Sequence, residues 1–263
     1  MPIRSIGIMC RSPYTIAKVN EGYAKKCELT AKTMQHLALR TLDQSPDQIV
    51  IISPMTARLP DRFGVSSQSL AGNLTNFKAP GVKTKLPFDV NFAGELCKVD
   101  NSRFEILPQI SLDHGVIVPL WYLQQAGWQG FTSFLTLPAS TGPSDLHAAG
   151  ESFKAFCRDD PQSIGIILSL ELSRSLNERS PLGMHEDGQK FDEAICQSIQ
   201  TNTLAKIKNL SQHFVKNANE DAYESLIFCL PLLESGKESQ ELMSYENQLG
   251  IGFLVASLYE AEN

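Results

Sequence analysis

The chain has 263 residues, a length that allows one large α/β domain or two small ones. Hydrophobic residues make up 42% of it and charged residues 20%, close to the averages of globular proteins, which argues against a disordered chain. The formal net charge of -6 argues against nucleic acid as a partner, because binding to phosphates needs a basic surface.

Cysteine usage and hydropathy indicate the compartment. The six cysteines show no C-x-x-C spacing and have apolar neighbours, so we expect buried free thiols rather than disulfides. They are Cys10, Cys27, Cys97, Cys157, Cys196 and Cys229. No apolar run approaches the ~18 residues of a membrane span, and no signal peptide is visible. These features predict a protein of the reducing cytoplasm that does not contact membranes.

The first elements follow a strand–helix–strand order. Residues 5–9 are apolar and are followed by Arg11-Ser12-Pro13, which predicts a strand that ends in a loop. Apolar residues at helical spacing predict a helix over residues 21–42, with Asn20 as its N-cap. Residues 48–52 predict a second strand, and the default is a parallel pairing with the first through a right-handed crossover.

The rest of the chain also alternates between strand-like and helix-like segments. Residues 60–87 are rich in Gly and Pro and predict a long excursion outside the core, whereas residues 116–125 begin apolar and become helical near Pro119. Further strands are predicted over residues 104–107, 131–137, 164–170, 241–245 and 251–259, and further helices over residues 91–97, 146–157, 191–200, 203–215 and 223–233. With no linker or repeat, we predict a single three-layer α/β domain over residues 1–263, with a mostly parallel central sheet and helices on both faces.

Several residues of possible functional importance follow predicted strands. In open α/β sheets, ligand sites form at the carboxyl ends of the strands, so these side chains are expected to converge. The residues in such positions are Arg11, Met55, Asp113, His114, Glu171 and Arg174.

Two turns contain residues suited to catalysis. In Ser111-Leu112-Asp113-His114-Gly115, a His beside an Asp could act as a general base or a metal ligand, or could simply cap a turn. A second polar turn, residues 181–188, holds His185, and the alternative there is a solvated loop. The remaining histidines, His36, His147 and His213, lie in predicted helices and are expected to be structural or exposed. No standard zinc, P-loop, dinucleotide or serine-hydrolase signature occurs.

Five motif-like segments follow one another along the chain. They are Ile52-Ser53-Pro54-Met55, Asp113-His114-Gly115-Val116-Ile117-Val118-Pro119-Leu120, Ser169-Leu170-Glu171-Leu172-Ser173-Arg174, Gly183-Met184-His185 through Phe191-Asp192, and Ser244-Tyr245-Glu246 through Gly250-Ile251-Gly252-Phe253. In order and spacing they resemble the class III (LigB-type) extradiol dioxygenases, nearest the branch associated with the AmmeMemoRadiSam system. The corresponding segments there read ISPH, DHG…VPL, SGDLSH, GYHPDG..FD and SYEGPFGVGY. The resemblance covers nearly the whole chain.

The resemblance implies an α/β sandwich that opens catechol-like rings with dioxygen. In that family two His and one Glu hold a ferrous ion, and a further His serves as acid/base. Carried over to this chain, the acid/base His falls on His114, with Asp113 beside it. The positions of family histidines fall on Arg11, Met55 and Arg174, and the carboxylate ligand falls on Glu220.

These departures bear on the metal. A guanidinium cannot be deprotonated and therefore cannot coordinate, and a thioether suits Cu(I) better than Fe(II). We therefore expect the ferrous site to be lost, with Glu220 as the one surviving candidate ligand and no cofactor required. We also expect Arg11 to replace the metal's charge by pairing with Glu220 or Asp113.

Three functions fit these patterns. The first is a non-catalytic binding or partner subunit, acting as a homo-oligomer or with a related subunit. The second is an enzyme of altered, metal-independent chemistry, in which Arg11, Arg58 and Arg174 clasp an anionic small molecule and His114 is the acid/base. The third is a working extradiol dioxygenase with Fe(II), an oxidoreductase in which His185 and His147 would have to serve as ligands.

Overall fold

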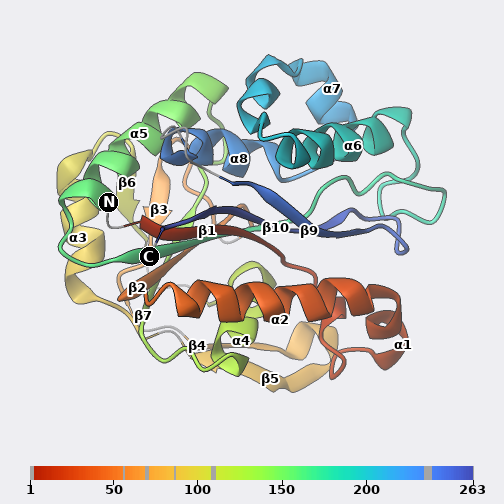
Figure 1. Cartoon of the computed structure of the whole chain (residues 1–263), viewed down its shortest axis with the longest axis horizontal. Coiled ribbons are helices and arrows are strands. Elements are labelled where there is room, and N and C mark those ends of the chain that lie inside the picture. Colours follow the sequence, from red (N-terminus) through yellow and green to blue (C-terminus); the bar gives the residue numbers. More distant parts are fainter. Residues whose placement is uncertain are drawn as a thin grey trace.

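An eight-stranded sheet forms the centre of the computed structural model, which describes residues 3–55, 57–68, 71–85, 87–107, 111–233 and 239–262 (Figure 1). Its strand order is β6-β3-β7-β2-β8-β1-β10-β9. The strands are β1 (Ile3–Cys10), β2 (Gln48–Ser53), β3 (Phe63–Val65), β6 (Phe104–Ile106), β7 (Phe131–Thr136), β8 (Ile164–Leu170), β9 (Glu241–Glu246) and β10 (Phe253–Glu260). The four central strands β7, β2, β8 and β1 are mutually parallel, whereas β3 joins β7, and β10 joins β1 and β9, in antiparallel pairs.

Helices cover both faces of this sheet, which confirms the predicted three-layer α/β architecture (Figure 1). On one face lie α1 (Glu21–Ala24), α2 (Glu28–Asp43), α4 (His114–Gln125) and the hairpin of β4 (Ala71–Leu74) and β5 (Ala79–Lys85). On the other face lie α3 (Val90–Val99), α5 (Pro143–Asp159), α6 (Glu186–Gln200), α7 (Gln212–Asn217) and α8 (Tyr223–Cys229). Short 3-10 helices span Pro13–Thr15, Lys25–Cys27, Thr75–Phe77, Leu204–Asn209 and Leu230–Leu233.

The central strands are apolar because both of their faces are covered. Every residue of β2 and β8 is buried, and two hydrophobic cores lie on opposite sides of the sheet. The buried strands bring their carboxyl ends to one edge of the structure, where loops carry polar side chains.

The first two strands are not neighbours, so the predicted direct pairing of residues 5–9 with residues 48–52 is wrong. Strand β8 lies between β1 and β2 and pairs with both in parallel. Helix α2 therefore connects two strands that have β8 between them. The spacing of apolar residues predicts the strands β1 and β2 themselves, but it does not predict that β8 lies between them.

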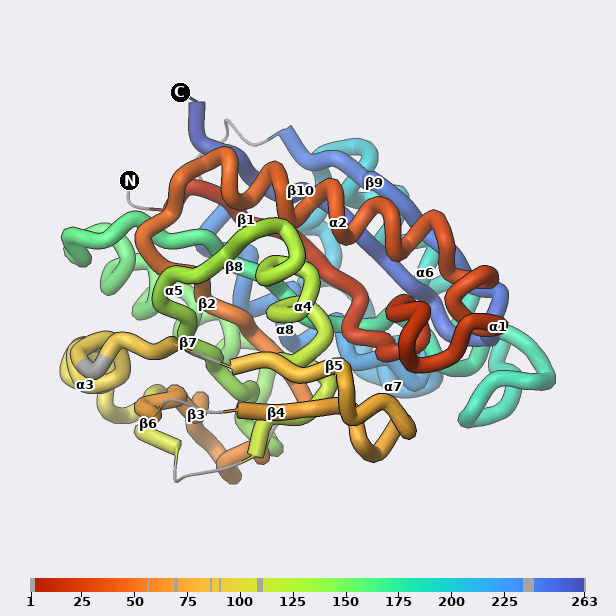
Figure 2. Tube along the Cα trace, turned by 90° about the horizontal axis from the view of Figure 1, so that it is seen from below, coloured from red at the N-terminus to blue at the C-terminus, as the bar shows by residue number. Residues whose placement is uncertain are grey.

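The segment 60–87 differs from the predicted excursion outside the core. Within its described part, β3 joins the main sheet and β4 pairs with β5 in a separate hairpin. Figure 2 shows this hairpin lying beside α4. The predicted helix over residues 203–215 is also interrupted, since its first part is a 3-10 helix and α7 begins only after Ser211, whose hydroxyl caps it.

Helix α4 begins at His114, earlier than the position predicted near Pro119. The Asp113 carboxylate caps it by accepting a hydrogen bond of 2.8 Å from the Gly115 N–H. Pro119 lacks the N–H that would bond to the Gly115 carbonyl one turn earlier. The Ser169 hydroxyl donates to that carbonyl instead, so the proline is tolerated inside the helix and α4 is tied to β8.

Two helical glycines offer a matched test of the packing. A Cβ added at Gly150 in α5 would lie 2.1 Å from the Phe228 carbonyl oxygen in α8, whereas one added at Gly94 in α3 would meet no atom within 4 Å. We expect Gly150→Ala to lower the free energy of unfolding by about 1 to 3 kcal/mol through overpacking. Gly94→Ala should raise it by up to about 1 kcal/mol through helix propensity. Urea unfolding followed by circular dichroism measures both, and equal effects would contradict the close packing of α5 on α8.

Two simpler predictions concern thiols and membranes. All six cysteines are free, as predicted, although Cys97 and Cys196 are half-buried rather than buried. In the described part of the chain, no helix combines the length and apolar character needed to span a bilayer.

Candidate functional site

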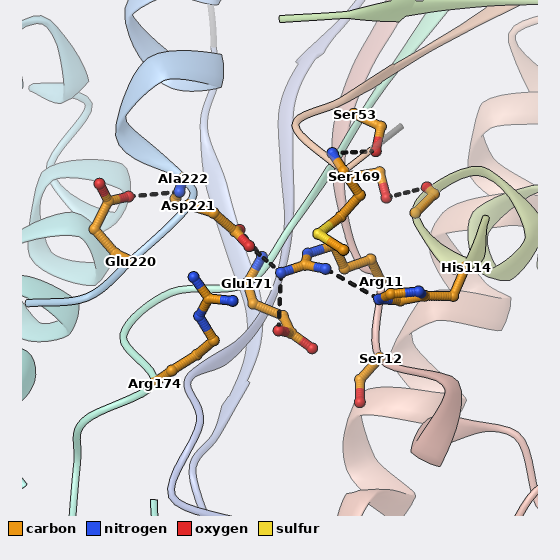
Figure 3. A network of polar contacts seen from close by, with 12 residues as sticks. Arg11, Ser12, Ser53, His114, Ser169, Glu171, Arg174, Glu220, Asp221 and Ala222 are labelled. Atoms are coloured by element: carbon orange, nitrogen blue, oxygen red, sulfur yellow. Dashed lines mark hydrogen bonds and ion pairs between the residues drawn. The ribbon is translucent and has the colours of Figure 1, made fainter. Parts of the chain in front are cut away.

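Four segments that are distant in sequence meet at the carboxyl ends of the parallel strands (Figure 3). Arg11 follows β1 directly and Glu171 follows β8 directly, while His114 is the first residue of α4. Asp221 lies in the turn before α8. The sheet order explains the meeting, because β1 and β8 are parallel neighbours that end side by side.

The Arg11 guanidinium is the centre of this cluster. Its side chain is 2% exposed, and its Nη2 forms ion pairs with Asp221 Oδ2 and, at 3.2 Å, with Glu171 Oε2. Its Nη1 lies 3.1 Å from His114 Nε2. Because a guanidinium only donates hydrogen bonds, His114 Nε2 must be the acceptor. His114 is therefore the neutral tautomer that carries its proton on Nδ1.

The electrostatics agree with these assignments. Burial, reinforced by the charge of Arg11, lowers the pKa of His114 to about 4. Burial alone lowers the pKa of Arg11, but the carboxylates of Glu171 and Asp221 outweigh it, so the net shift is upward and the guanidinium stays charged. Burial raises the pKa of Glu171, and the charge of Arg11 opposes that rise.

Asp221 is held in place by a second contact. Its Oδ1 accepts a hydrogen bond of 2.9 Å from the Glu171 N–H, while its Oδ2 faces Arg11. One carboxylate thus joins the end of β8 to the end of β1 and to the turn before α8.

Asp113 and Met55 lie beside the cluster, and both contact the first turn of α4. Asp113 caps α4, so it is not the carboxylate that pairs with Arg11. Met55 follows β2 and is 37% exposed. A Cβ added at Gly115 would lie 3.0 Å from the Met55 Cβ, so Met55 borders the first turn of α4.

The other two arginines predicted for the cleft have different surroundings. Arg58 forms an ion pair with Glu224 at 2.5 Å and donates from Nε to the Pro138 carbonyl at 2.9 Å. Arg174 donates from Nε to the Asn219 carbonyl at 3.4 Å, and its guanidinium points toward Asp221 and Glu171 (Figure 3).

His185 and Glu220 both accept hydrogen bonds from backbone N–H groups at the start of a helix. His185 is the N-cap of α6, where its Nδ1 accepts from the Asp187 N–H at 3.1 Å. Glu220 points away from Arg11 and accepts hydrogen bonds from Ala222 N at 2.5 Å and Tyr223 N at 2.6 Å (Figure 3). The predicted pairing of Arg11 with Glu220 or Asp113 is therefore wrong, because both carboxylates are engaged by backbone N–H groups.

The sequence contained signals for the two carboxylates that pair with Arg11. Glu171 stands at a predicted strand end, and Asp221 is the neighbour of Glu220. Asn219 adopts a left-handed backbone conformation (φ 50°), so the chain turns sharply just before Glu220 and Asp221. The residue-type pattern alone does not say which of two adjacent acids faces inward.

Three of the motif segments meet away from the cluster, at Asp192. Its carboxylate accepts a hydrogen bond from Ser173 N at 2.8 Å and another from the Tyr245 hydroxyl at 2.7 Å. A Cβ added at Gly252 would lie 2.1 Å from Asp192 Oδ2, so only glycine fits there. Burial raises the pKa of Asp192 to about 7. These contacts stabilise the architecture and explain why the motifs predict the fold well.

The residues present do not fit the ferrous ion that the resemblance implies. The Arg11 guanidinium lies between His114, Asp221 and Glu171 and cannot coordinate a metal. Its charge also opposes a divalent ion at the same place. Within the described ranges, no three His, Cys, Asp or Glu side chains form a group that could hold a metal.

The fold and strand-end site define an α/β protein of the LigB architecture, and comparisons establish the family. The model of the family described as the catalytic LigB subunit of aromatic ring-opening dioxygenase matches residues 8–255. The chain therefore belongs to the LigB family.

Two further proteins are similar to this chain. Protein CA_C1420 of Clostridium acetobutylicum is 23% identical over 278 residues, a match that covers all of this chain but only 59% of that protein's length. The crystal structure of an uncharacterized protein, JW3007 from Escherichia coli K12, shares the fold with a TM-score of 0.60. That match covers 84% of this chain and 90% of the other at 15% identity, which shows the fold alone.

Proposed function

We propose that this chain is a LigB-fold binding or partner subunit that has lost the ferrous chemistry of its family. The observation that carries the proposal is the buried Arg11 guanidinium between His114, Asp221 and Glu171. A buried pair of carboxylates needs a positive charge nearby, and Arg11 supplies it from within the chain. On this proposal the chain needs no metal and acts through a second copy of itself or a related subunit.

The geometry argues against the alternative of an enzyme that clasps an anionic small molecule with three arginines. The charge of Arg11 is already balanced by two carboxylates, and that of Arg58 by Glu224. The guanidinium of Arg174 points toward the same carboxylates that pair with Arg11, which would repel an anion. His114 is also poorly placed as an acid at neutral pH, since its pKa is about 4.

The geometry also argues against a working dioxygenase that uses other histidines. His185 caps α6, and His147 lies on α5 with its Nε2 2.8 Å from Lys208 Nζ. Neither residue belongs to the cluster around Arg11, so a ligand set with His114 would require these helices to move.

Metal stoichiometry tests the proposal. The untagged chain is purified anaerobically, offered Fe(II), Zn(II), Mn(II) and Cu in turn, and analysed for metal bound per chain. We expect a stoichiometry near zero for each metal and no cleavage of catechols. One iron bound per wild-type chain, accompanied by ring cleavage, would refute the proposal, and loss of that iron in Glu220→Ala would identify Glu220 as a ligand. Asp187→Ala, which removes a carboxylate in the first turn of α6 instead, serves as the control variant.

A further inference from the structure

The acceptors around Arg11 have the form of a binding site. We propose that Asp221, Glu171 and His114 make a cation site shaped for a planar guanidinium, and that Arg11 is its tethered occupant. This inference rests on the proposed function, because it treats the guanidinium as the resident cation of the strand-end cluster. It goes further in assigning the site to the three acceptors rather than to Arg11.

Contacts that do not involve Arg11 hold the carboxylate of Asp221 and the backbone at His114 and Glu171. Asp221 is fixed through its Oδ1 by the Glu171 N–H. His114 is fixed by the first turn of α4, which Asp113 caps and Ser169 ties to β8. Glu171 continues the backbone of β8, a strand buried along its whole length. The site should therefore persist when the Arg11 side chain is removed.

The spacing of the acceptors selects the shape of the cation. The two carboxylates share one terminal nitrogen of the guanidinium, Nη2, and the imidazole takes the other, Nη1. A planar fork with donors on separate nitrogens satisfies this arrangement, whereas a spherical ion meets the acceptors at one point. In keeping with that spacing, no group of three potential metal ligands occurs in the described part of the chain.

The tether means that any dissolved cation must compete with Arg11 for the three acceptors. A ligand that is covalently attached beside its site has a high effective concentration, so a dissolved competitor does not displace it. Wild-type protein should consequently be indifferent to millimolar guanidinium. A variant that lacks the tether should bind it.

The test uses Arg11→Ala and guanidinium chloride at concentrations far below those that denature proteins. We expect saturable binding of one guanidinium per chain by calorimetry. At about ten times the dissociation constant, the melting temperature should rise by roughly 3 to 6 °C. Equal KCl should not reproduce the rise. Wild type and Arg40→Ala, which loses an arginine with two carboxylate partners at the surface, should show no such binding.

Two further measurements decide the matter. Adding Asp221→Asn to Arg11→Ala should abolish the binding, and a folded Arg11→Ala chain that binds no guanidinium overturns the inference. If Arg11→Ala does not fold alone, its refolding yield is compared in guanidinium chloride and in equal KCl, and equal yields overturn the inference. The proposed function fails separately, since it is refuted by iron bound to the wild-type chain.

Discussion

Replacing Arg11 with alanine is expected to lower the free energy of unfolding by about 3 to 5 kcal/mol, as is typical when one partner of a buried ion pair is removed. The buried Glu171 and the largely buried Asp221 would then lack their cation, and His114 Nε2 would lose its donor. Urea unfolding at pH 7 measures the loss.

Arg40→Ala is the matched control for this prediction. Arg40 also pairs with two carboxylates, Glu241 at 2.6 Å and Glu260 at 2.8 Å, but its side chain is 26% exposed. Solvent screens that interaction, so we expect a loss of no more than about 1 kcal/mol. Similar losses for the two variants would contradict the central role of Arg11.

Acidification is expected to weaken the fold through His114. Its folded pKa of about 4 lies below the ordinary value of 6.5, so protons bind the unfolded chain first as the pH falls. Stability from this group is complete above pH 6.5 and is lost progressively toward pH 4. The shift corresponds to a loss of about 3 kcal/mol across that window.

His114→Gln isolates this contribution. Glutamine does not titrate, and its amide oxygen can still accept a hydrogen bond from Arg11. Burial raises the pKa of Asp192 to about 7 and that of Glu220 to about 8. These two carboxyls bind protons more readily in the folded chain, so they increase its stability as the pH falls, opposite to His114. Both acids are present in wild type and variant, so their effect cancels in the difference. An equal acid loss in the two proteins, from unfolding curves at pH 7 and pH 4, would disprove the assignment.

The helices and strands were largely predictable because the spacing of apolar residues along the chain reflects which side chains are buried. The fully apolar β8 and the alternation of strands with helices define a sheet covered on two faces. The place of β8 between β1 and β2 was not predictable, because neighbours in a sheet are chosen by tertiary packing. The start of α4 was predicted too late, near Pro119, for a similar reason. The Gly115 carbonyl, which Pro119 cannot bond, accepts a hydrogen bond from Ser169 on β8 instead.

The site was predictable in part. Strand-end reasoning brought Arg11, His114 and Glu171 toward one edge, and the structure shows them in one cluster. The resemblance to the LigB family placed a carboxylate at Glu220, whereas the structure turns its neighbour Asp221 toward Arg11. Which of two adjacent acids faces inward depends on the turn at Asn219 and on the N–H groups that each carboxylate finds, and neither is visible in residue types.

The position of β1 has a consequence for the order of folding. β1 pairs on one side with β8 and on the other with β10, whose register joins Ser5 to Glu260 across nearly the whole chain. Arg11, which follows β1, contacts His114 and Asp221, which lie 103 and 210 positions further along the chain. Contacts so distant in sequence slow folding, because the closing of a long loop precedes any gain from them. During synthesis, the native set of contacts around Arg11 is therefore complete only after Asp221 has left the ribosome, although the end of β1 can pair with β8 before that.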